Sequence, residues 1–202
     1  MNYEALLDRI LRKVDRDAYL ALADSVEPDQ QAALDEIGRA LHGASFDAEA
    51  LAQRAHQLHQ QGRIDEVNLH SALHVIDAHP SVGRLERAAE HVARQELAAY
   101  RQGGARLQAN LASVERHRGV IAWQQGQLDQ ALDYFSRAFE RQRSAGNLAN
   151  VLACLVRLGE EHDARDLLGQ VRAAFPAAMI EALNQLIARD PDLALLRSEI
   201  HQ

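Results

Sequence analysis

The chain has 202 residues, of which 47% are hydrophobic and 25% are charged, a balance typical of a globular protein. Its formal net charge is -7 and it has no run of five basic residues, so binding to nucleic acid or to an anionic membrane is disfavoured. Lys13 is the only lysine and lies in a charged run, which excludes a Gly-Lys-Ser phosphate loop and a pyridoxal Schiff base.

The sequence also indicates the cellular location. No window approaches 18 apolar residues, and the N-terminus has no apolar core of signal-peptide length. Cys154 is the sole cysteine and lies in the apolar run 151–156, so we expect a buried thiol and neither a disulfide nor a CxxC metal site. We therefore expect a cytoplasmic protein, and the strong arginine bias favours a bacterial source with a GC-rich genome.

Strong helix formers dominate the composition, and their spacing predicts an all-α chain. Apolar residues from Tyr3 onward recur at i, i+3 and i+4, which predicts an amphipathic helix running to about Asp24. A second helix is predicted over 28–41, with proline in its first turn. Further helices are predicted over 47–61, 64–78, 82–102, 105–125, 128–145, 148–158, 161–175, 177–189 and 191–200.

Glycine and proline mark the breaks between these helices. Because the links are short and the helices are similar in length, neighbouring helices should be antiparallel. The predicted breaks lie at Gly62, His79-Pro80, Gly103-Gly104, Gly126, Gly146-Asn147, Gly159, Pro176 and Asp190-Pro191.

An internal repeat is the most informative feature of the chain. The turn Gly126-Gln-Leu-Asp-Gln-Ala131 recurs as Gly83-Arg-Leu-Glu-Arg-Ala88 and, more loosely, after Gly62 and Gly159. A wider pattern also repeats after a shift of 33 residues. It carries Gly119, Ala122, Gly126, Ala131, Phe135 and Ala138 onto Leu152, Leu155, Gly159, Ala164, Leu168 and Val171.

This pattern resembles the tetratricopeptide repeat, a unit of about 34 residues built from two antiparallel helices. The longer spacing between Gly83 and Gly126 is similar to that of kinesin light chains and of helical sensor regions in bacterial regulators. The resemblance implies an α-α superhelix of helix hairpins, in which residues 1–46 form an N-terminal helical region and 47–202 form the array. The best repeats are 112–144 and 145–177, and residues 177–202 supply a capping pair.

The resemblance places a candidate partner-binding surface on the first helix of each repeat, which lines the concave side in this family. In the two best repeats, the side chains expected to project into this groove are Arg116, Val120, Trp123, Gln124, Ala153, Val156 and Arg157.

Trp123 and the two arginines are the informative members of this set. As an exposed tryptophan, Trp123 would be an anchor for a partner, whereas within an apolar run it would be part of the core. Arg116 and Arg157 could hold a carboxylate or phosphate bidentately, or simply be solvated. Chaperone-binding members of the family clamp a C-terminal carboxylate with lysine and asparagine, whereas this chain has valine at position 120 and no lysine in the repeats.

Six of the ten histidines lie between residues 56 and 91, in the spacings His56-x-x-His59 and His70-x-x-x-His74. Each pair lies on one helix face, which allows a metal site or a pH response between about 6 and 7. The alternative is ordinary surface or hydrogen-bonded histidines. HExxH is absent, so no metal ligand is assigned.

The sequence therefore predicts an adaptor, chaperone or regulatory module that holds a partner protein or peptide, with no cofactor and no catalytic residue. A sensor domain for a short signalling peptide is one alternative. A helical metal-binding enzyme that uses the clustered histidines is another. Homo-oligomerisation through the apolar N-terminal helix is a further open alternative.

Overall fold

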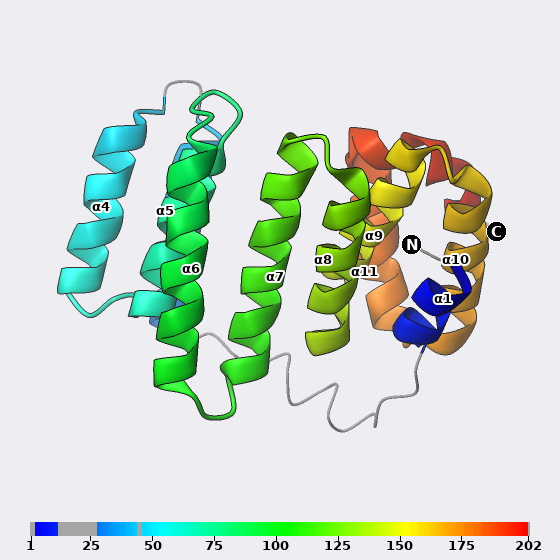
Figure 1. Ribbon diagram of the computed structural model, residues 1–202, viewed down its shortest axis with the longest axis horizontal. Helices are drawn as coiled ribbons and strands as arrows, with labels where there is room; N and C mark the ends of the chain where they lie inside the picture. Colours follow the sequence, from blue (N-terminus) through cyan, green and yellow to red (C-terminus); the bar gives the residue numbers. More distant parts are fainter. Residues whose placement is uncertain (1–2, 12–27, 44–45, 202) are drawn as a thin grey trace. The chain divides into compact units, whose positions relative to one another are not determined.

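The computed structural model describes residues 3–11, 28–43 and 46–201, and every regular element in those ranges is a helix (Figure 1). The all-α prediction is therefore confirmed for this part of the chain. Two compact units are present, one formed by Leu22–Ile121 and the other by Met1–Ala21 together with Ala122–Gln202. The division at residue 46 suggested by the sequence is a different partition and stays a prediction.

The unit Leu22–Ile121 is built around α5 (Glu66–Ala78), which packs against α3 (Pro28–Leu41), α4 (Ala48–Gln60) and α6 (Leu85–Gln102). Because α5 has neighbours on several sides, nine of its thirteen residues are buried. The first part of α7 (Leu107–Gln124) packs on α5 and α6 through an apolar cluster that includes Val67, Ala99 and Leu111.

Aspartates begin two of these helices. The Asp47 carboxylate accepts hydrogen bonds from the N–H groups of Glu49 and Ala50, and the Asp65 carboxylate accepts one from Asn68. Each carboxylate satisfies donors that have no partner inside the helix, and such a cap contributes about 1 kcal/mol. These caps set the first residues of α4 and α5.

The other unit is centred on α9 (Ala145–Leu158). This helix packs against α8 (Leu128–Arg141), α10 (Glu161–Ala174), α11 (Ala177–Arg189) and the 3₁₀ segment η1 (Pro191–His201). Cys154 on α9 is fully buried, and burial raises the pKa of its thiol to about 12. The predicted structural thiol is thus confirmed.

The repeated positions lie where the sequence predicts close packing. Ala131 and Ala138 of α8 are 0% exposed and Phe135 is 3% exposed, and their counterparts Ala164, Leu168 and Val171 on α10 are all fully buried. Gly126 and Gly159 have φ values of 74° and 82°, in the left-handed region that favours glycine at a turn. The small residues therefore sit where neighbouring helices approach closely.

The predicted boundary between α8 and α9 is wrong. The predicted break at Gly146 lies inside the first turn of α9, because Ser144 caps that helix by accepting a hydrogen bond from the N–H of Asn147. As a result, α8 ends at Arg141 rather than at residue 145. The segment predicted as a helix over 191–200 is present as the 3₁₀ segment η1.

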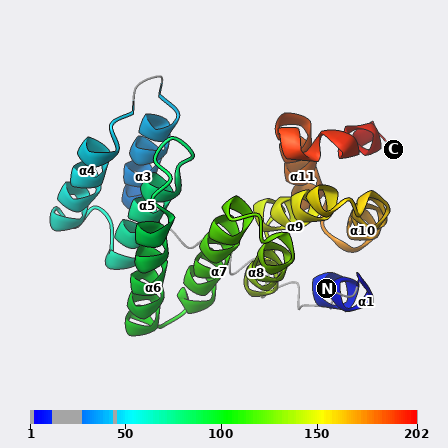
Figure 2. The ribbon, with the colours of Figure 1, turned by 45° about the horizontal axis from the view of Figure 1, so that its top comes forward.

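The N-terminal helix α1 (Tyr3–Leu11) packs against α8 and α10 of the same chain, as Figure 2 shows. The rest of the predicted first helix, to residue 24, lies outside the described residues. Leu6 and Ile10 of α1 are 1% and 0% exposed, so these two residues of the predicted apolar stripe are buried within the chain, and oligomerisation through this helix stays a prediction. Within the described ranges, none of the helices combines the length and apolar character needed to cross a membrane.

Candidate functional site

Two of the predicted groove residues, Trp123 on α7 and Arg157 on α9, are brought together on the surface. The Arg157 guanidinium carbon lies 5.2 Å from the centroid of the Trp123 ring, within the range of a cation–π contact. The Trp123 residue is half-buried, whereas 55% of the Arg157 side chain is exposed. Trp123 is thus neither fully exposed nor fully buried, and its role as an anchor for a partner stays a prediction.

Asp192 of η1 holds the arginine in this position. Its carboxylate lies 3.5 Å from Nη1 of Arg157, so the guanidinium contacts both the indole ring and a carboxylate. An exposed ion pair of this kind contributes little to stability. It does restrict the rotamers of Arg157, and ordering the side chain in advance lowers the entropy cost of a later contact.

The remaining predicted residues of this unit surround the pair less closely. Gln124 is exposed and Val156 is half-buried. Ala153 is only 7% exposed, because α9 is covered by its neighbouring helices, so its methyl group offers little area to a ligand. The part of the predicted set that is accessible in this unit is therefore Trp123, Gln124, Val156 and Arg157.

Arg116 and Val120 belong to the other unit, although they share α7 with Trp123. Arg116 is exposed and its Nη2 donates a 3.4 Å hydrogen bond to Oγ of Ser113, whereas Val120 is half-buried. Both residues have accessible surface, and their part in partner binding stays a prediction.

A buried histidine pair lies in the same unit. The rings of His74 on α5 and His117 on α7 stack with centroids 4.2 Å apart, and the residues are 1% and 3% exposed. Nδ1 of His117 lies 2.8 Å from Oε1 of Gln95, whose Nε2 donates to Oγ of Ser113 at 3.2 Å. Nδ1 of His74 faces the Ala88 carbonyl oxygen at 3.4 Å. This polar group is therefore a hydrogen-bonded part of the core.

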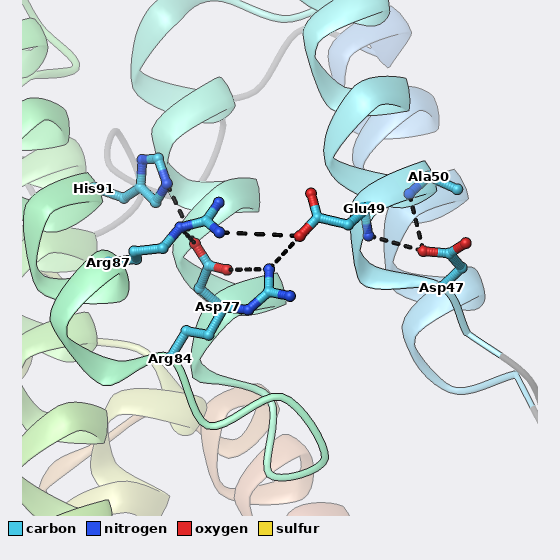
Figure 3. A network of polar contacts seen from close by, with 7 residues as sticks. All are labelled: Asp47, Glu49, Ala50, Asp77, Arg84, Arg87 and His91. Atoms are coloured by element: carbon cyan, nitrogen blue, oxygen red, sulfur yellow. Dashed lines mark hydrogen bonds and ion pairs between the residues drawn. The ribbon is translucent and has the colours of Figure 1, made fainter.

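A second pair, His70 and His91, stacks with ring centroids 5.7 Å apart beside a buried aspartate. The Asp77 side chain is 3% exposed and contacts Nε2 of His91 at 3.4 Å, Nε of Arg87 at 3.4 Å and Nη1 of Arg84 at 3.6 Å. Arg84 also pairs with Glu49 of α4 (Figure 3). A buried charge persists when partners compensate its desolvation, and this network joins α4, α5 and α6 through Asp77.

Desolvation keeps these histidines neutral. It lowers the pKa of both His70 and His74 to about 4, and it is also the main cause of the lowered pKa of His91. The pKa of His117 is lowered too, first by burial and then by the neighbouring His74. The pH response expected between 6 and 7 therefore moves to more acidic values.

A protein zinc site normally needs three or four ligands that converge on one point. Across residues 3–11, 28–43 and 46–201, no group of three or more His, Cys, Asp or Glu side chains is arranged to hold a metal ion. His70 and His74 share one helix face, as the sequence predicts, but each stacks on a different histidine from another helix. The His70-x-x-x-His74 spacing on α5 therefore belongs to two stacked histidine pairs.

The sequence did not predict which residues these histidines contact, and it did not predict that α1 packs on α8 and α10. His74 and His117 lie 43 positions apart, and α1 contacts α8 and α10 more than a hundred residues away.

Comparison with family models, with curated proteins and with solved structures gave no match. The tetratricopeptide resemblance therefore rests on the repeated residues alone.

Proposed function

We propose that this chain is a protein–protein interaction module that binds a partner protein or peptide at the surface around Trp123 and Arg157. The observation that carries the proposal is the half-buried tryptophan with an exposed arginine over its ring. Tryptophan and arginine are enriched among residues that dominate binding energy, in sites with a covered centre and a wetter rim. A cytoplasmic location remains part of this proposal.

Trp123→Ala tests the proposal most directly. We expect it to weaken partner binding by about 2 kcal/mol or more, since truncating a central aromatic anchor removes most of its contact area. Arg157→Ala should have a smaller effect in the same direction. Arg189→Ala is the matched control, because it removes an exposed arginine from α11 instead.

The measurement uses the three variants and the unchanged chain as baits in cells of the native organism, followed by mass spectrometry and titration of the purified partner. A partner that is retained by the Arg189→Ala chain and lost by the Trp123→Ala chain supports the proposal. A partner that binds the folded Trp123→Ala chain with full affinity refutes this surface as the site. Circular dichroism of each bait establishes that the helices persist.

A further inference from the structure

The helix α1 packs against both α8 and α10 (Figure 2), and we call the surface of α8 and α10 that α1 covers the groove between α8 and α10. Leu6 and Ile10 are 1% and 0% exposed, and because they are four residues apart they lie on one face of α1. Burying these aliphatic side chains favours the docked state of α1. Apolar contact alone would hold any amphipathic helix, in either direction.

Polar contacts at the two ends give the groove a direction. At the N-terminal end of α1, the Tyr3 hydroxyl donates to Oδ2 of Asp166 at 2.7 Å and to the Asp163 carbonyl oxygen at 3.1 Å. At the C-terminal end, Nη1 of Arg143 donates to the Ile10 carbonyl oxygen at 3.2 Å. Acidic groups at a helix N-terminus and a cation at its C-terminus both match the helix dipole.

The arginine that receives the end of α1 is positioned by the groove itself. Its guanidinium carbon lies 5.6 Å from the ring centroid of Phe139 and 5.7 Å from that of Phe175. The two rings contact each other edge-on, at a centroid separation of 5.7 Å. Arg143 is thus held between α8 and the end of α10, where it can donate to the exposed carbonyl groups of a docked helix.

One side of the groove adds a charge contact. Arg9 of α1 lies 3.0 Å from Oδ1 of Asp133 and 3.5 Å from Oε1 of Glu140, both on α8. The side chains of all three residues are about one-third exposed, so the pairs select a partner more than they stabilise it. The acidic wall therefore favours a basic residue at this position of the occupant.

We propose that the groove between α8 and α10 is a directional binding site for an amphipathic helix, with α1 as its tethered occupant. The helix that it accepts carries a hydroxyl-bearing aromatic residue at its start, aliphatic residues three and seven positions later, and an arginine six positions later. A free helix of this kind must compete with α1, which is covalently joined to the groove and so binds it intramolecularly.

A fluorescent peptide of residues 1–14 tests the proposal by anisotropy against the full chain. The chain variant Leu6→Asp with Ile10→Asp vacates its own groove, so we expect saturable binding of the peptide to it. Binding to the unchanged chain should be at least tenfold weaker, since α1 competes. The Trp123→Ala chain should behave as the unchanged chain does, because that surface is separate.

Matched peptides test direction and charge. Arg9→Glu in the peptide should weaken binding at least tenfold, and Asp133→Arg in the vacated chain should restore it. Ala5→Gln alters an exposed position of α1 and should leave binding unchanged. A reversed-sequence peptide that binds equally well, or no saturable binding to a vacated chain of unchanged helicity, overturns the proposal. If the vacated chain does not fold, the full chain with Arg9→Glu takes its place. The unchanged peptide should then bind this variant more tightly than it binds the unchanged chain.

Discussion

At the scale of single residues, small side chains decide how closely the helices pack. Ala131 of α8 is 0% exposed, and α8 packs against α9. Ala131→Leu adds three carbons at a fully buried position, and because protein interiors are closely packed it should lower the free energy of unfolding by roughly 1 to 3 kcal/mol. Urea denaturation followed by circular dichroism measures the loss.

Ala182→Leu is the matched control, because it makes the same change at an exposed position of α11. Its free energy of unfolding should stay within about 0.5 kcal/mol of the unchanged chain. If Ala131→Leu were as stable as Ala182→Leu, the repeat register that places Ala131 at a close helix contact would be incorrect.

The repeat also shows which residue positions a sequence can reveal. Ala131, Phe135 and Ala138 were identified as packing positions because the same kinds of residue recur 33 positions later, and all are buried. Ala153 was assigned to the groove from the same shift, yet it is covered. A repeat in the sequence predicts which residues share one face of a helix, but it does not predict which other helices cover that face.

At the scale of elements, the buried histidines join α5, α6 and α7 and should make this unit sensitive to acid. The folded pKa of His74 is about 4, below its ordinary value of 6.5, so the unfolded chain binds more protons between these values. The contribution of His74 to the free energy of unfolding is therefore fully present above pH 6.5 and decreases as the pH falls toward 4. For His74 alone the loss at pH 5 is on the order of 2 kcal/mol.

Urea titrations at pH 7.5 and pH 5 measure this loss, and His74→Phe should reduce it because the ring no longer titrates. The variant should also be slightly less stable at pH 7.5, since the contact with the Ala88 carbonyl oxygen is removed. His162→Asn changes an exposed histidine of α10 and should keep the full pH dependence. An identical pH dependence in His74→Phe would show that this histidine does not link protonation to folding.

Helix positions were predicted well where the sequence carries its own start and stop signals. The bounds of α3 and of α11 agree to the residue, because Pro28 and Gly43 mark the ends of α3 and Pro176 and Pro191 mark those of α11. Gly146 misled the prediction because a glycine in the first turn of a helix is tolerated when a serine caps it. The contacts of α1 and the histidine pairs are absent from any local pattern, since they join residues far apart in sequence.

At the scale of the whole molecule, the chain has two compact units, and each has a core of its own. The four histidines with lowered pKa values, His70, His74, His91 and His117, all lie in Leu22–Ile121, whereas the only tryptophan, Trp123, lies in the other unit. Tryptophan fluorescence therefore reports mainly on one unit, and circular dichroism reports on the helices of both.

If the units unfold separately, acid should separate the two probes. Lowering the pH from 7.5 to 5 should shift the first half of the circular dichroism transition to lower urea while the fluorescence midpoint moves much less. In His74→Phe the two curves should lie closer together at pH 5, because much of the acid effect on Leu22–Ile121 is removed. Coincident transitions at both pH values, with equal shifts, would mean that the chain unfolds as one cooperative structure and that protonation in one unit is felt in full by the other.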